Sequence, residues 1–314
     1  MDIAPFIRYN ILNSPWKREK NMHYIIFDLE WNQCADEASL VCQPICLHGE
    51  IVELGAVKLN DRFEIADELR LLIAPHFYPK LHRRIAALTG ISDKELQARG
   101  VPFPEAFAQF MDWCGEDCLW MTWSTSDLPI LLDNLMIHGM DISALPDYCD
   151  VQRIFSREIM RSDTQYSLDT ALAILKEKGD TAHDALHDAR NTAKVCRHLE
   201  LETYLGEYTG RVFALPPTGQ SYESRRELLS DPALSTFPCP WCGETVRCEP
   251  WISFGHGISA TYGTCPENDE FLVQLHPACH RRDEYSAKRL VFELTDDLWD
   301  IYLDKKEAAQ GITP

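Results

Sequence analysis

Apolar residues follow two different periods along the first 200 positions of the chain. Short runs of strand length occur at residues 24–27, 51–60, 63–75 and 118–124. Between and after these runs, apolar residues return every three or four positions, which is the period of amphipathic helices. Three strands followed by strands alternating with helices predict an α/β domain on a mixed sheet flanked by helices, whose first three strands form an antiparallel meander.

The helical pattern is interrupted at places where capping residues stand. Gly90 breaks the first stretch, Ser92 and Ser167 are N-cap candidates, and Gly115 closes another stretch. Helices are expected over residues 81–97 (with that break), 102–115, 127–140, 151–160, 167–179 and 182–206.

The composition changes after residue 207. Pro216, Pro217 and Gly219 predict a linker over 208–235. Short β-like runs with cysteines and turns then predict a small C-terminal β-rich domain over 236–305, with a helix near its end and a tail at 306–314. The compact first domain is expected over 22–207. Residues 1–21 are expected to form an N-terminal extension, and Met22 is a candidate start.

Length and charge restrict the class of protein. A chain of 314 residues suits two domains. A chain with a net charge of −19 is not expected to have the broad basic surface that binds duplex nucleic acid through many phosphate contacts. A nucleic-acid substrate would therefore be bound at a small local site. No apolar run is long enough to span a bilayer, and residues 1–21 lack the apolar centre of a secretory signal, so a cytoplasmic protein without membrane contact is expected. The twelve cysteines are then expected to be reduced.

Two carboxylates end the first apolar run. Side chains two apart on a strand point to the same face, so Asp28 and Glu30 project together while Leu29 turns away. Neighbouring carboxylates repel unless one holds a proton or a cation lies between them, and oxygen ligands suit Mg²⁺ or Mn²⁺. An Asp-x-Glu pair on an ordinary surface is the alternative.

Two further acids stand out by context. Asp127 lies where a strand passes into a helix, which is the edge at which α/β sheets bind ligands. The alternative is that Asp127 only stabilises the helix N-terminus through its interaction with the helix dipole. Asp188 follows His183 by five residues. On a regular helix that spacing turns about 500°, so the two side chains converge only if His183 lies before or at the first turn.

Taken together, FDLEW, the strand before Asp127 and the H-x4-D of HDALHDARNTA resemble the three motifs of the DEDDh 3′-to-5′ exonucleases, over about residues 22 to 205. Within them, DLEWN, EIVELGAVKLN and LTGI are most similar to the branch that trims histone mRNA and small interfering RNA ends. The resemblance implies a ribonuclease H-like fold, with two Mg²⁺ or Mn²⁺ ions held by Asp28, Glu30, Asp127 and Asp188. It implies His183, rather than His187, as the general base.

The resemblance also implies where a substrate is bound. Its contacts would come from Leu29, Trp31 and the LTGI residues Leu88, Thr89, Gly90 and Ile91. Trp31 suits either stacking on a base or a place in the core. The implied activity is hydrolysis of single-stranded nucleic acid from 3′ ends, RNA preferred, releasing nucleoside 5′-monophosphates. A DNA-trimming or proofreading nuclease, an oligoribonuclease-like enzyme and a non-catalytic nucleic-acid-binding protein are the alternatives.

The C-terminal domain carries a candidate zinc site. Cys239-Pro-Trp-Cys242-Gly is a zinc-knuckle pattern, and Cys265 follows at the end of a predicted hairpin, as in a zinc ribbon. The fourth ligand is not evident, because Asn268 stands where a second knuckle would place it, whereas Cys248, His276 and Cys279 are other candidates. A structural Zn²⁺ and a metal-free ribbon both remain open.

Overall fold

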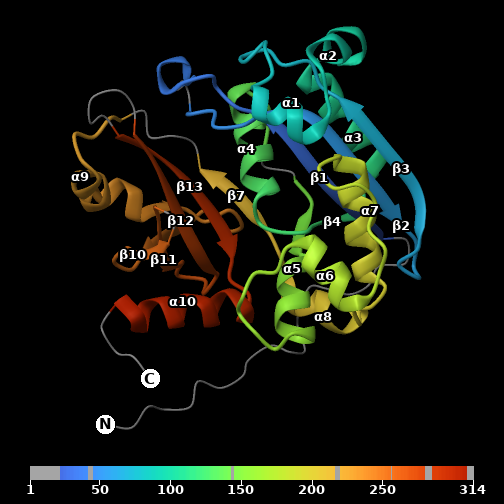
Figure 1. Cartoon of the computed structure of the whole chain (residues 1–314). Coiled ribbons are helices and arrows are strands. Elements are labelled where there is room, and N and C mark those ends of the chain that lie inside the picture. The colour runs from blue at the N-terminus through green and yellow to red at the C-terminus, as the bar shows by residue number, and fades with distance from the viewer. Residues whose placement is uncertain are drawn as a thin grey trace.

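The computed structural model describes residues 22–41, 45–142, 145–215, 220–255, 257–279 and 285–309, and it contains two sheets side by side (Figure 1). The predicted extension at 1–21 lies outside these residues. The strands of the first sheet, in chain order, are β1 (His23–Asn32), β2 (Glu50–Leu59), β3 (Ile65–Leu72), β4 (Cys118–Thr122), β5 (Asp147–Asp150) and β6 (Thr209–Gly210).

The first sheet has the strand order β3-β2-β1-β4-β5-β6. Strands β1, β2 and β3 are antiparallel neighbours, whereas β4 and β5 run parallel to β1. The predicted mixed sheet with an antiparallel meander is therefore confirmed, and β5 and β6 are additions that the apolar pattern did not predict. The helices of this part are α1 (Arg83–Thr89), α2 (Asp93–Arg99), α3 (Phe103–Cys114), α4 (Asp127–Ile137), α5 (Val151–Ile154), α6 (Leu168–Leu175), α7 (Ala185–Cys196) and α8 (Leu201–Tyr208), with short helices η1 (Glu37–Ser39) and η2 (Phe155–Ile159).

Alternation along β1 divides the core between the two faces of the sheet. Tyr24 and Ile26 belong to one hydrophobic cluster with residues of helices α5, α6, α7 and α8. Ile25 and Phe27 join α3, α4 and residues of the second sheet in the other. Because successive strand side chains point to opposite faces, this sequence buries both sides of β1. Helix α7 thus covers one face, and α4 lies between the two sheets (Figure 1).

The second sheet is antiparallel, with the order β7-β13-β12-β11-β9-β8 and β10 paired to β11. It confirms the predicted β-rich C-terminal region. Helix α10 packs against one face through Tyr302, which clusters with Ala260 and Leu272. Its elements are β7 (Val212–Leu215), α9 (Arg225–Ser230), η3 (Pro232–Ser235), β8 (Thr236–Pro238), β9 (Thr245–Cys248), β10 (Ile252–Gly255), β11 (Ile258–Thr264), β12 (Glu270–Cys279), β13 (Tyr285–Glu293) and α10 (Asp296–Ala309).

Three sequence expectations differ from the structure. The segment 208–235, expected to be a linker, carries β6, β7, α9 and η3 in its described residues, with β6 paired to β5 and β7 paired to β13. Pro216, Pro217 and Gly219, on which that expectation rested, lie outside the described residues. The helix expected over 182–206 is divided into α7 and α8 by a turn in which His198 and Leu199 donate to carbonyls three residues back. Helix α10 continues through Ala309, so part of the expected tail is helical. Among the described residues, no helix combines the length and the apolar character needed to cross a bilayer.

Candidate active site

The alternation of β1 places two acids on the face that α7 covers. Asp28 and Glu30 continue the set of Tyr24 and Ile26, the side chains that pack toward α7. Both acids are partly exposed, in contrast to the apolar residues before them. The strand therefore ends with two carboxylates directed to the same side, as its period predicts.

A glycine on the neighbouring strand lets α7 approach these acids. Gly55 pairs with Asp28 across β1 and β2, and a Cβ placed on it would lie 2.0 Å from the backbone nitrogen of Leu186. Only a residue without a side chain permits this contact. Helix α7 therefore begins against the backbone of β2, and Asp188 in its first turn lies over the acids of β1.

His183 and Asp188 converge just before this helix. The backbone N–H of His183 donates to Asp188 Oδ2 at 2.9 Å, and His183 has a φ of 64°. One ring nitrogen of His183 and one carboxylate oxygen each of Glu30 and Asp188 lie within 4.8 Å of one another. The left-handed backbone turns the chain ahead of the first helical turn, which is the arrangement that the five-residue spacing required.

Asp127 is brought to the site by the start of α4. Its Oδ1 accepts the backbone N–H of Leu29 at 3.1 Å, which fixes it beside the segment between Asp28 and Glu30. Leu29 itself is 2% exposed and packs in the core on the opposite face. Its side chain therefore does not reach a substrate, contrary to the expectation, and its backbone positions Asp127 instead.

Burial raises the pKa values of all four acids, and repulsion within the set adds to this effect for Asp28, Glu30 and Asp127. Burial, followed by the charges of Asp127, Asp188 and Glu30, raises the pKa of Asp28 well above its usual value. Burial and the neighbouring acids raise the pKa of Glu30 to about 8, and burial raises the pKa of Asp127 to about 7. Burial also raises the pKa of Asp188. Such a set holds excess protons unless a cation offsets the charge, so these donors fit hard divalent ions.

A fifth acid lies beside the site and was not predicted from the sequence. Glu53 pairs with Glu30 across the two strands and is fully buried. Arg70 Nε lies 2.5 Å from its Oε1, and the other Glu53 oxygen accepts the N–H of Ala185 at 3.4 Å. Arg70 also binds Asp184, the N-cap of α7, at 3.0 Å. Glu53 therefore anchors the start of α7.

The residues expected at a substrate divide into exposed and buried ones. Leu88, at the end of α1, is 44% exposed, and Gly90 follows it in a left-handed C-cap. Ile91 is instead 3% exposed and packs with Val52 and Leu96. Its side chain therefore does not reach a substrate, contrary to the expectation. Thr89 is half-buried and donates from Oγ1 to the carbonyl of Ile85. Leu88 and Gly90 are thus the surface-exposed members of the LTGI segment.

Asn32 connects that segment to the acids. Its Oδ1 accepts the N–H of His82, the N-cap of α1, at 2.8 Å, and its amide donates to the carbonyl of Tyr78 at 2.9 Å. The last residue of β1 therefore holds the beginning of α1 close to the end of the strand that carries the acids. Trp31, before it, is half-buried and packs beside Gly49, at the rim of the core cluster.

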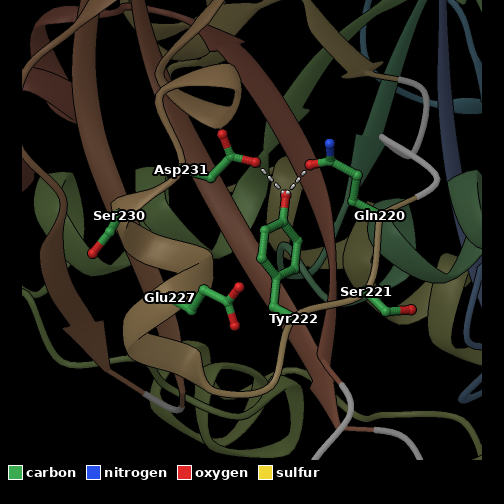
Figure 2. A pocket seen from close by; sticks show the side chains of 6 residues that line it. All are labelled: Gln220, Ser221, Tyr222, Glu227, Ser230 and Asp231. Carbon is green, nitrogen blue, oxygen red and sulfur yellow. Dashed lines mark hydrogen bonds between the residues drawn. The ribbon is translucent and has the colours of Figure 1, made fainter.

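A hollow of about 530 Å³ lies over α9, in the C-terminal part of the chain (Figure 2). Tyr222 Oη donates to Asp231 Oδ2 at 2.6 Å and to Gln220 Oε1 at 3.2 Å there. The other Asp231 oxygen accepts the N–H of Ala233, and Glu227 accepts the N–H of Glu223. The acids of this hollow therefore fix the local backbone.

The fold and the acid set define a nuclease of the DEDDh superfamily. The model of the exonuclease family RNase_T matches residues 25–196, more than half of the chain, and the chain belongs to this family. No curated protein compared with the chain matches it at a significant level.

Solved structures with the same fold include the nuclease domain of 3′hExo, a DEDDh family member bound to rAMP, at 19% identity and TM-score 0.50. That likeness covers 59% of this chain and 94% of the other. Escherichia coli exonuclease I in its zinc-bound complex with single-stranded DNA gives 12% identity and TM-score 0.50, over 77% of this chain and 54% of that one. Cell-death related nuclease 4 gives 17% identity and TM-score 0.47, over 56% of this chain and 62% of its own length. The chain thus spans less than two thirds of the last two proteins.

Proposed function

We propose that this protein is a divalent-metal-dependent 3′-to-5′ exonuclease that shortens single-stranded nucleic acid, RNA preferred, and releases nucleoside 5′-monophosphates. The observation that carries the proposal is the convergence of Asp28, Glu30, Asp127 and Asp188 with His183 on one edge of the first sheet. A protein that only binds nucleic acid has no use for four adjacent, partly or fully buried carboxylates, whose raised pKa values make them costly to ionise without a cation.

The four carboxylates would hold two Mg²⁺ or Mn²⁺ ions, which supply activation of a water and stabilisation of the leaving 3′-oxygen in an in-line displacement. Leu29 keeps Asp127 in place through its N–H, and the backbone of His183 keeps Asp188 in place. The exposed imidazole of His183 lies near Glu30 and Asp188, where it can accept the proton of the attacking water. Leu88, which is 44% exposed, would pack against the terminal nucleotide.

RNA preference rests on the resemblance to exonucleases that trim RNA ends and on the fold shared with 3′hExo, whose structure contains rAMP. The single-stranded DNA complex of exonuclease I keeps DNA as the second candidate substrate. The net charge of −19 favours a substrate held locally at its 3′ end over one held along a duplex.

The test uses 5′-labelled single-stranded RNA and DNA of the same base sequence, with Mg²⁺ or Mn²⁺ and without a divalent ion. The expected result is a ladder that shortens one nucleotide at a time, with nucleoside 5′-monophosphates as products and faster shortening of RNA. Asp28→Asn and Asp188→Asn should each remove nearly all turnover. Asp112→Asn, an exposed acid on α3, is the matched control and should keep it.

Several outcomes would refute parts of this proposal. Cleavage that persists in both active-site variants would show that the acid set is not required for the reaction. Release of internal fragments would show an endonuclease. Faster shortening of DNA than of RNA would leave the exonuclease in place and reverse the substrate preference.

A further inference from the structure

A second group of metal-binding side chains lies in the C-terminal part of the chain, in the second sheet. One ligand atom each from Cys239, Cys242, Cys265 and Asp269 lie within 4.8 Å of one another. Cys239 and Cys242 belong to the turn between β8 and β9, and the other two to the turn between β11 and β12. We propose that these four residues bind one structural Zn²⁺, with Asp269 as the fourth ligand.

The distances fit a tetrahedral site. With Zn–S bonds of about 2.3 Å and Zn–O bonds of about 2.0–2.2 Å, a tetrahedron has S–S edges of about 3.8 Å and S–O edges of about 3.5–3.7 Å. Cys242 Sγ and Cys265 Sγ are 3.7 Å apart, and Asp269 Oδ2 lies 3.1 Å from both Cys239 Sγ and Cys265 Sγ. Small outward movements of the carboxylate would therefore complete the coordination shell.

The two turns direct backbone N–H groups at two of the sulfurs. The N–H groups of Trp241 and Cys242 point to Cys239 Sγ. The N–H of Asp269 lies 3.4 Å from Cys265 Sγ, and the N–H of Glu267 also donates to that sulfur. Such bonds stabilise thiolates, the form in which cysteine binds metal.

The second turn explains why the fourth ligand was not evident in the sequence. Asn268, the position that a C-x-x-C spacing selects, has a left-handed φ of 67°, and its N–H donates to the carbonyl of Cys265. The chain needs one more residue before a side chain faces the cysteines again, and that residue is Asp269.

Two of the other candidate ligands, Cys248 and His276, lie away from the cluster and contact other residues. Cys248 packs beside Gly263 where β9 meets β11, and His276 lies on β12 next to Gln274. Neither belongs to the cluster of four ligand atoms. The side chain of Cys279 is outside the described residues.

A metal here would compensate for a small core. Cys239 and Cys265 are themselves core residues, in one cluster with Phe237, Val246 and Phe271. Strands β8 and β9 form the end of the sheet, and one ion would link their turn to the β11–β12 turn. Metal binding of this kind contributes directly to folding.

The test is the metal content of the full chain, prepared under reducing conditions with Zn²⁺ supplied and without chelator. About one zinc per chain is expected by elemental analysis. Cys242→Ser and Asp269→Asn should each weaken retention against a competing chelator at least tenfold, whereas Glu244→Gln, an exposed acid in the β8–β9 turn, should retain zinc as the wild type does. Asp269→Cys should retain zinc, and its Co²⁺-substituted form should show stronger thiolate-to-metal absorption than the Co²⁺-substituted wild type.

The outcomes separate the alternatives even if one variant folds poorly. Wild-type protein without zinc would show that the cluster is a metal-free ribbon. Zinc retained by Asp269→Asn but lost by Cys242→Ser would move the fourth ligand to another residue. Unchanged Co²⁺ absorption in Asp269→Cys would likewise exclude position 269 from the coordination shell.

Discussion

At the residue scale, neighbouring side chains on β1 point to opposite faces of the sheet and therefore have different roles. Asp28 and Glu30 face α7, while Leu29 is buried on the other side and offers only its backbone to the site. This division was predictable from the sequence, since it follows from the period of a strand. The position of Asp127 at a strand-to-helix edge was predicted separately, because it follows an apolar run and opens a helix.

His183 provides the first prediction. An imidazole must be neutral to accept a proton from water, so the rate should fall toward low pH in the wild type. We expect His183→Ala to lower turnover by a factor of about 10² to 10⁴, the usual range for a general base, with Mn²⁺ and substrate affinities little changed. The measurement is a pH–rate profile of both proteins at saturating Mn²⁺.

The alternative role for His183 is metal ligation, because its ring lies within 4.8 Å of the carboxylate oxygens of Glu30 and Asp188. In that case the variant would require more Mn²⁺ for half-maximal rate. His187→Ala serves as the control, since His187 Nδ1 faces Asp184 at 3.9 Å. A variant at 183 that keeps the wild-type rate and acidic limb would make His187 the next candidate for the base.

Two residues of the candidate sites could not be identified from the sequence alone. Glu53 matters because cross-strand register places it opposite Glu30, and register is a tertiary property. Asp269 faces the cysteines because Asn268 adopts a left-handed conformation. In both cases the residue type was visible, but the geometry that gives it a role depends on partners far away or on one extra residue in a turn.

At the element scale, the position of α7 decides whether the acids meet. The helix was predicted from its apolar spacing, yet its end was not, because apolar residues continue at helical spacing through the turn at 197–200. Strands β6 and β7 were missed for a related reason. They are short, lie in a segment of apparent linker composition, and exist only because β5 and β13 offer them partners.

The closeness of α7 to β2 leads to the second prediction. Gly55→Ala would place a methyl group 2.0 Å from the backbone of Leu186, so α7 must move and carry Asp188 away from Asp28. Overpacking of this kind costs about 1–3 kcal/mol of stability. We expect a lower melting temperature together with a higher Mg²⁺ concentration for half-maximal cleavage, measured well below the melting temperature.

Gly206→Ala is the matched control for this substitution. Gly206 lies on α8 with nothing within 4 Å of its added Cβ, so alanine should be neutral or stabilise the protein by about 0.4–1 kcal/mol. If Gly55→Ala behaved like this control in both stability and Mg²⁺ requirement, the contact with α7 would not be what positions Asp188.

At the scale of the whole molecule, the second sheet supports the helix that carries Asp127. Helix α4 begins at Asp127 and packs between the two sheets, where Leu290 of β13 shares a core cluster with Leu131 and Leu135. Arg153 and Arg157 of the first part bind Asp297 of α10. The sequence predicted two sheets but gave no indication of this packing, because the contact surfaces come from segments more than 100 residues apart.

The third prediction concerns the buried ion pair at this contact. Lys288 Nζ on β13 lies 2.6 Å from Asp133 Oδ1 on α4, and their side chains are 12% and 8% exposed. Asp133→Ala would leave the lysine buried without its partner, which costs roughly 3–5 kcal/mol in such pairs, whereas the double variant Asp133→Leu/Lys288→Met should recover most of that loss. Urea unfolding, followed by tryptophan fluorescence and by circular dichroism, measures the stabilities of the single and the double variant.

Because the two sheets share one hydrophobic cluster, the two probes should give coincident transitions in the wild type. Separate transitions would mean that the second sheet unfolds independently of α4, and a single variant as stable as the wild type would mean that the pair is hydrated in solution.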